Sequence, residues 1–119
     1  MESKKYNLEE RIFILSKKVL MLCKTLPENT ISRPLISQLV RSATSIGANY
    51  MEANGSVSIK DLINKICIAR KEAKETLYWV RLLMFLFVEK INEFQLIFQE
   101  TQELVFIFSS IIKKIQAQN

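Results

Sequence analysis

The sequence has very few of the residues that interrupt regular structure, with only two glycines and two prolines among its 119 residues. Glycine and proline mark tight turns, hairpins and phosphate-cradling loops, so their scarcity predicts a few long elements joined by few turns. Histidine is absent, which excludes Ser-His-Asp and Cys-His catalysis and the common zinc sites. We therefore expect a protein that is not an enzyme and that binds neither a metal nor a cofactor.

Cysteine is also scarce. Cys23 and Cys67 are too few for a disulfide framework and too far apart for a metal knuckle, so we interpret both as reduced thiols. The N-terminus carries acidic residues where a secretory signal would need an apolar stretch. The very apolar segment 79–88 ends at Glu89 and Lys90, well short of the ~20 residues of a membrane span. These features predict a cytoplasmic protein without membrane contact.

Apolar residues make up 49% and charged residues 24% of the chain, which are the proportions of an ordinary globular protein. The length fits one domain, residues 1–119. The 17 basic and 12 acidic residues give a net charge of +5, and the excess of basic residues lies in the first two thirds of the chain. Because a basic surface concentrates polyanions, nucleic acid is the first class of partner to consider.

Apolar residues recur at alternating spacings of three and four along nearly the whole chain, which is the pattern of amphipathic α-helices. Interruptions at 27–30, 54–57 and 90–93 divide the pattern into four helices, the first of about 17 residues. Four such helices with short connections predict an all-α, antiparallel up-down-up-down four-helix bundle. The expected core seams are Ile12, Leu15, Val19, Leu22 and Leu26; Ile36, Leu39, Ala43, Ile46, Tyr50 and Ala53; Ile59, Leu62, Ile66, Ala69, Ala73, Thr76, Val80, Leu83 and Phe87; and Phe94, Ile97, Thr101, Leu104, Phe108, Ile111 and Ile115.

Local signals predict where these helices begin and end. Ser32 is the expected N-cap of the second helix, and Asn54 or Gly55 is expected to end it in the left-handed conformation. Ser58, followed three residues later by an acid, resembles a capping box for the third helix. Asn92 is expected to cap the fourth helix.

The predicted seams leave a surplus of apolar residues on the last two helices. Monomers seldom expose a contiguous apolar patch of the size that these residues could form, so the surplus predicts a homo-oligomer. A wider core stripe around a tight bundle is the alternative. The surplus residues are Trp79, Leu82, Phe85, Leu86, Val105, Phe106 and Ile107.

The second helix carries a polar strip opposite its apolar seam. At 100° per residue, Arg41, Ser45, Asn49 and Glu52 fall within an arc of about 80°. We interpret the strip as structural, with hydrogen bonds at a helix junction or subunit contact. The alternative, a small-ligand or acid-base site, lacks a second carboxylate or a nucleophile. The candidate partners of the strip are Arg70, Glu72 and Glu75 on the third helix.

The same stretch carries a resemblance to a known family. It reads R-S-A-T-S-I-G-A-N-Y-x-E-A from Arg41, followed by S-x-x-D-L and then by A-R-K-E-A-x-E-T. This pattern resembles the four-helix-bundle family that includes the proteins encoded in intervening sequences of bacterial 23S ribosomal RNA genes and the accessory protein of diversity-generating retroelements. The resemblance implies an antiparallel bundle that assembles as a homopentamer and binds RNA or a reverse transcriptase through a basic surface.

Basic residues supply the candidate nucleic-acid-binding surface. One group lies on the third helix opposite its seam, together with a tyrosine that can stack on bases, and a second group lies on the first helix. Such side chains can hold a nucleic-acid backbone without reading its sequence. The alternative is a solvated outer face. The candidate residues are Lys60, Lys71, Lys74, Arg81 and Tyr78, and then Arg11, Lys17, Lys18 and Lys24.

Two functions are compatible with these sequence features. The first is a nonenzymatic, oligomeric accessory protein that binds RNA or another nucleic acid through its basic surface. The alternative is an oligomeric protein-interaction scaffold that makes no direct contact with nucleic acid. A small hydrolase or nucleotide-binding enzyme is disfavoured, because the chain has no phosphate loop and no clustered carboxylates.

The first testable prediction is a stable homo-oligomer, with a pentamer favoured by the resemblance. The surplus apolar residues on the last two helices are the physical reason, since burying them between subunits removes them from water. Light scattering at micromolar concentration measures the mass directly. A monomer mass under those conditions would contradict the prediction.

Overall fold

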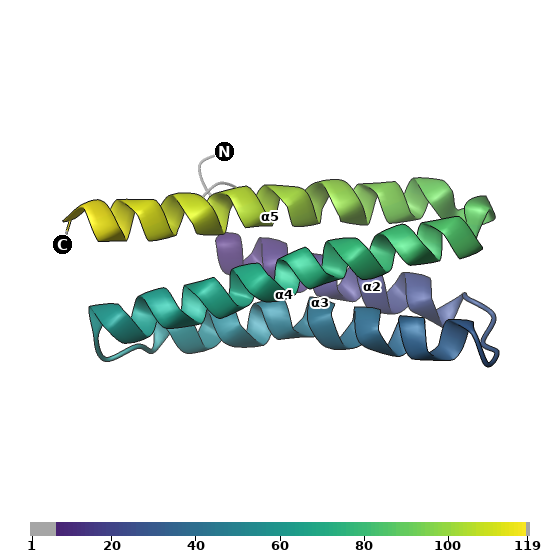
Figure 1. Ribbon diagram of the computed structural model, residues 1–119, viewed down its shortest axis with the longest axis horizontal. Helices are drawn as coiled ribbons and strands as arrows, with labels where there is room; N and C mark the ends of the chain where they lie inside the picture. The colour runs from purple at the N-terminus through teal and green to yellow at the C-terminus, as the bar shows by residue number, and fades with distance from the viewer. Residues whose placement is uncertain (1–6, 119) are drawn as a thin grey trace.

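The structure is a computed structural model that describes residues 7–118, and this part of the chain folds into four long helices (Figure 1). They are α2 (Leu8–Lys24), α3 (Ser32–Asn54), α4 (Ile59–Leu86) and α5 (Ile91–Gln118), with a 3₁₀ turn, η1 (Val88–Lys90), before α5. Consecutive helices run antiparallel, and each packs against the next, as expected for an up-down bundle. The predicted all-α fold and the number of helices are therefore confirmed.

Each helix turns its predicted seam towards a common core. The largest side chains that are fully buried include Leu15, Leu39, Leu83 and Phe94, so every helix contributes to it. Ile59 departs from the prediction with 48% of its surface exposed, because it is the first residue of α4 and lies at the end of the bundle. The other predicted seam residues are buried or packed against the core, apart from Ile115, which is partly exposed.

The four helices differ in length, and α2 is the shortest. It has 17 residues, whereas α4 and α5 each have 28. In Figure 1 α2 lies behind the other helices and covers only part of the length of α5. Beyond the first turn of α2, the bundle consists of α3, α4 and α5 within the described residues. Beside the first turn of α2, where Tyr50 and Glu9 line the same hollow, the ring of Tyr50 packs against Phe108, with 6.2 Å between ring centres.

The start of α3 differs from the prediction, because Asn29 and not Ser32 acts as the cap. The Asn29 side-chain oxygen accepts hydrogen bonds from the backbone N–H groups of Ile31 (2.8 Å) and Ser32 (2.9 Å). Ser32 is buried, and its hydroxyl donates to the carbonyl oxygen of Pro27 at 2.9 Å. Its side chain thus holds the α2–α3 connection together, which leaves the free N–H groups at the helix start to Asn29.

Two further helix ends also differ from the prediction, and one agrees with it. Gly55 has φ −98°, so α3 does not end in the left-handed conformation; instead the N–H of Gly55 donates to the carbonyl of Glu52, in a 3₁₀-type ending. Asn92 lies inside the first turn of α5, because η1 already leads the chain into that helix. Ser58 does cap α4: its hydroxyl oxygen accepts from the N–H of Asp61 at 3.0 Å.

Small and hydroxyl-bearing residues line the contact between α3 and α4. Ala43 on α3 and Ala69 and Ala73 on α4 have no exposed surface, which is consistent with a close approach of the two helices. The hydroxyls of Ser42 and Thr76, both fully buried, form a hydrogen bond of 2.9 Å across this contact. Each hydroxyl can also donate to a carbonyl oxygen of its own helix, Ser42 to Leu39 and Thr76 to Glu72, so the bond between them favours this register of the two helices without being the only partner of either group.

The surplus apolar residues range from partly buried to largely exposed, with Leu82 partly buried and Leu86 38% exposed. Trp79, Val105 and Ile107 are partly buried and pack against the core, which widens it as the alternative interpretation expected. Phe85 and Phe106 remain 79% and 76% exposed. They lie on different helices, Phe85 at the end of α4 and Phe106 in the middle of α5. Within residues 7–118, no helix combines the length and the apolar character that crossing a bilayer requires.

The buried hydroxyl pair generates a prediction. Thr76→Val removes one partner and leaves the Ser42 hydroxyl buried with only a long bond of 3.3 Å to the Leu39 carbonyl, so we expect a loss of about 1–3 kcal/mol in unfolding free energy. The double variant Ser42→Ala/Thr76→Val should lose less than the sum of the single variants, because no hydroxyl is then stranded. Urea denaturation of the four proteins measures this coupling. Strict additivity would contradict the proposed role of the pair.

Candidate nucleic-acid interface

A basic stripe runs along the solvent-facing side of α4. Its four cations are Lys60, Lys71, Lys74 and Arg81, and all four are exposed. Tyr78 lies among them with 55% of its surface exposed, and its ring packs edge-on against Trp79 at 5.2 Å. From residue 60 to residue 81 the stripe covers about 32 Å at a rise of 1.5 Å per residue. We call these five residues the α4 basic stripe.

The four cations of the α4 basic stripe are not paired with neighbouring acids in the described part of the chain. Among the described residues, no ion pair involves any of its four cations. Glu72 and Glu75 of α4 lie on the side that faces α3, where both pair with Arg41. Phe85 continues the stripe at the same helical spacing and is also exposed. Phe85 was not among the residues predicted for this surface.

The basic group on α2 is less uniform than predicted. Arg11 is not free, since its guanidinium bridges α2 to α5 through ion pairs with Glu100 (2.9 Å) and Glu103 (2.6 Å). Hydrogen bonding to Glu100 raises the pKa of Arg11, although burial opposes the effect. Lys17 lies over the Phe13 ring, with its ammonium nitrogen 4.9 Å from the ring centre. Lys17 and the other two predicted lysines, Lys18 and Lys24, remain exposed.

The polar strip of α3 lies beside α4. Arg41 donates to Glu72 at 3.1 Å and also pairs with Glu75, two of the three partners that the sequence suggested. Burial tends to lower the pKa of Arg41, but the charges and hydrogen bonds of the two glutamates outweigh it and raise the pKa. Ser45 and Asn49 bond within α3, to the carbonyl oxygens of Arg41 and Ser45 respectively.

The other end of the strip differs from the prediction. Glu52 is 61% exposed in its side chain and pairs with Lys65 of α4 at 2.7 Å, a partner that residue spacing did not predict. The hydrogen bond to Glu52 raises the pKa of Lys65. Arg70 is not a partner of the strip, because it donates to the Ser109 hydroxyl of α5 at 3.1 Å. Arg70 therefore joins α4 to α5, whereas the strip joins α3 to α4.

The described part of the chain offers few groups for metal binding or thiol chemistry. No group of three or more Cys, Asp or Glu residues within 7–118 could hold a metal ion. Cys23 is buried, and burial raises the pKa of its thiol to about 11. A thiol with such a pKa stays protonated near neutral pH and is a poor nucleophile.

The geometry of the strip predicts that its two charged ends differ in importance. Arg41→Ala leaves the carboxylate of Glu72, only 11% exposed in its side chain, without its cation, so we expect a loss of about 1–3 kcal/mol in unfolding free energy. Glu52→Ala removes an exposed ion pair and should cost about 0–1 kcal/mol. Thermal and urea denaturation compare the two variants, each serving as the control for the other. Equal costs, or a larger cost for Glu52→Ala, would contradict this assignment.

Comparison with known proteins agrees with this architecture. The model of the family described as 23S rRNA-intervening sequence protein matches residues 4–110. A solved structure of a protein with unknown function, from the S23 ribosomal protein family of Bacteroides thetaiotaomicron VPI-5482, is 33% identical; the match covers 88% of this chain and 97% of that one, with a TM-score of 0.79. No curated protein is similar enough to count as a match. The predicted link to the retroelement accessory protein has no support among these matches. The chain belongs to the 23S rRNA-intervening sequence protein family.

Proposed function

We propose that this protein is a nonenzymatic, oligomeric accessory protein that binds RNA or another nucleic acid through the α4 basic stripe. The observation that carries the proposal is the combination of four exposed cations without ion pairs in the described structure and an exposed tyrosine on one helix face. RNA binding is also what the family resemblance implies, so RNA is the class of ligand to test first.

The physical argument rests on what unpaired cations do at a surface. Lysine and arginine without a protein carboxylate gain most from a polyanion, because each phosphate contact releases condensed counterions. Tyr78, and Phe85 beyond the stripe, can stack on bases of any sequence. The stripe is a convex helix face, which can touch phosphates and ring faces but does not enclose the edges of a base. We therefore expect backbone binding with little sequence preference.

Oligomerisation is the second part of the proposal, with a pentamer favoured by the family resemblance. Phe85 and Phe106 are the exposed aromatic residues that would gain most from a subunit contact. Several copies of the stripe on one assembly would raise the affinity for a long RNA above that of a single copy. The alternative remains a protein-interaction scaffold, in which subunits assemble but the stripe binds no nucleic acid.

The double substitution Lys71→Glu/Lys74→Glu tests the stripe. We expect it to weaken binding to all RNAs alike without dissociating the oligomer, because both lysines are exposed and contribute little to the core. In the parent, affinity for single-stranded RNA should fall with salt at a log-log slope of about −0.7 per phosphate contact. Filter binding at several salt concentrations, with light scattering on the same samples, measures both effects.

The matched control is Lys113→Glu/Lys114→Glu, which makes the same change of charge at two exposed lysines of α5. It should reduce binding less than the stripe variant, since any loss it causes reflects net charge alone. Equal losses in the two variants would show that the stripe has no special role. No binding by the parent in dilute salt would favour the scaffold.

A further inference from the structure

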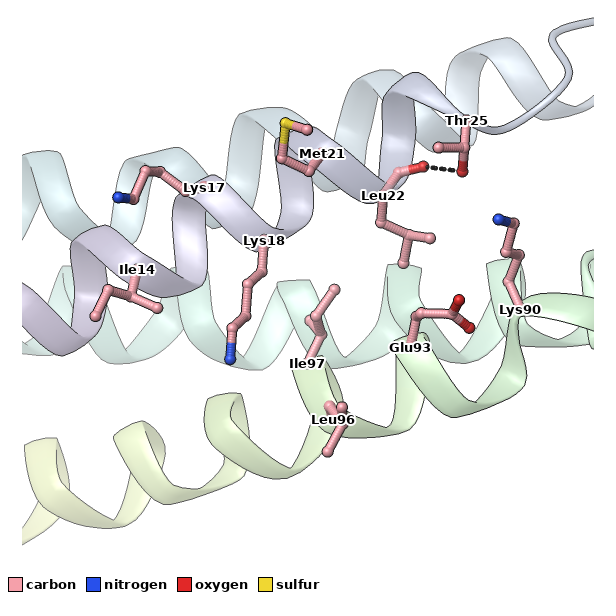
Figure 2. Close-up of a pocket in the computed structure, with 10 residues that line it drawn as sticks. All are labelled: Ile14, Lys17, Lys18, Met21, Leu22, Thr25, Lys90, Glu93, Leu96 and Ile97. Carbon is pink, nitrogen blue, oxygen red and sulfur yellow. Dashed lines mark hydrogen bonds between the residues drawn. The ribbon is translucent and has the colours of Figure 1, made fainter.

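A groove runs between the first and last helices, on a different side of the bundle from the α3–α4 contact. Two adjoining hollows of about 620 Å³ and 360 Å³ form it, and Ile14, Lys18 and Leu96 line both of them. Of the neighbouring helices in the bundle, α2 and α5 contact each other least, because α2 packs mainly on α3. Figure 2 shows the larger hollow, with side chains from α2 above it and from α5 below it.

The floor of the groove is apolar, and its walls carry apolar side chains that are exposed to solvent. Leu22 and Ile97, only 7% and 3% exposed, form part of the floor. Met21 on α2 and Leu96 on α5 are 61% and 63% exposed, and Ile14 is 38% exposed. Such an apolar channel between two helices has the shape into which the apolar face of a further helix packs.

Basic side chains outnumber acidic ones in the larger hollow of the groove. Lys17 and Lys18 line it from α2, and Lys90 lines it from η1, just before α5, with Glu93 as the acid of the larger hollow. None of these four forms an ion pair within residues 7–118. In the smaller hollow Glu100 and Glu103 share the single guanidinium of Arg11, which leaves one negative charge in excess among these three residues. The excess of positive charge therefore lies in the larger hollow, where three lysines accompany one glutamate.

From these observations we propose that the α2–α5 groove binds an amphipathic α-helix of a partner protein, with aspartate or glutamate beside its apolar face. The α2 wall from Ile14 to Thr25 is about 16 Å long, or three helical turns, which suits a bound segment of about 12 residues. Lys17 and Lys18 on α2 and Lys90 on η1 match several acids along such a helix, whereas a fatty acid carries one anionic group at one end. None of the described residues that line the larger hollow is aromatic, so it offers bases no stacking surface, unlike the α4 basic stripe.

The test uses two fluorescent helical peptides of about 12 residues, with leucines at i, i+3, i+4 and i+7. One carries glutamates beside the leucines, and the other carries lysines at the same positions. Fluorescence anisotropy with the full chain should show that the glutamate peptide binds and that the lysine peptide binds at least tenfold more weakly. Leu96→Glu should weaken the binding of the glutamate peptide at least tenfold. The matched control is Met51→Glu, at an apolar residue of α3 outside the groove that is 58% exposed against 63% for Leu96, and it should leave binding unchanged.

Charge reversal on the protein separates specific docking from general attraction. Lys18→Glu/Lys90→Glu should reverse the preference, so that the lysine peptide binds more tightly than the glutamate peptide. Lys113→Glu/Lys114→Glu changes the net charge equally and should not reverse it. Circular dichroism checks that each variant is folded, and Leu96→Gln replaces Leu96→Glu if the latter loses helicity.

Four results would overturn the proposal. They are the absence of binding by either peptide, binding that Leu96→Glu leaves unchanged, displacement of the peptide by an oligouridine, and loss of the oligomer in Leu96→Glu when the parent binds no peptide. The third result would assign the groove to nucleic acid, and the fourth would assign it to a contact between copies of this chain. A charge-reversed preference confined to the groove variants would support the proposal, and it does not depend on whether the α4 stripe binds RNA.

Discussion

The close contact between α3 and α4 determines how the rest of the molecule is arranged. Its alanines have no exposed surface, and the buried Ser42–Thr76 hydrogen bond favours the observed register of the two helices. At the edge of this contact, Arg41 forms ion pairs with Glu72 and Glu75. Together these contacts fix the rotation of α4 about its own axis. The exposed side of α4, with its lysines and Tyr78, follows directly from that rotation.

Spacing along the sequence was sufficient to predict the fold. Alternating steps of three and four residues predicted four helices and nearly all of the core, because burial of an apolar stripe needs little more than the helical period. The helix ends were harder to predict. Ser32 and Asn29 are both good capping residues, and the choice between them depends on the burial of Ser32 in the α2–α3 connection. The spacing of residues contains no information about that burial.

The candidate site was predictable to a similar extent. A helical wheel correctly placed the α4 lysines opposite the seam, since exposure depends on rotation alone. Contacts between helices depend also on their axial register, which a single helix does not encode. The sequence therefore suggested Glu72 and Glu75 for Arg41, but it missed the Glu52–Lys65 pair and assigned Arg70 to the wrong neighbour. The α2–α5 groove escaped prediction for the same reason, because it arises from unequal packing of α2 on its two neighbours.

The shortness of α2 makes the two ends of the bundle unequal. At the end nearest Thr25 a cross-section cuts four helices, whereas beyond Leu8 it cuts three among the described residues. Fewer neighbours per residue mean that backbone amides there open at a lower free-energy cost than those in the four-helix part. We therefore expect the backbone amides in the last turns of α5 and the first turns of α4 to exchange with solvent faster than those beside the Ser42–Thr76 contact.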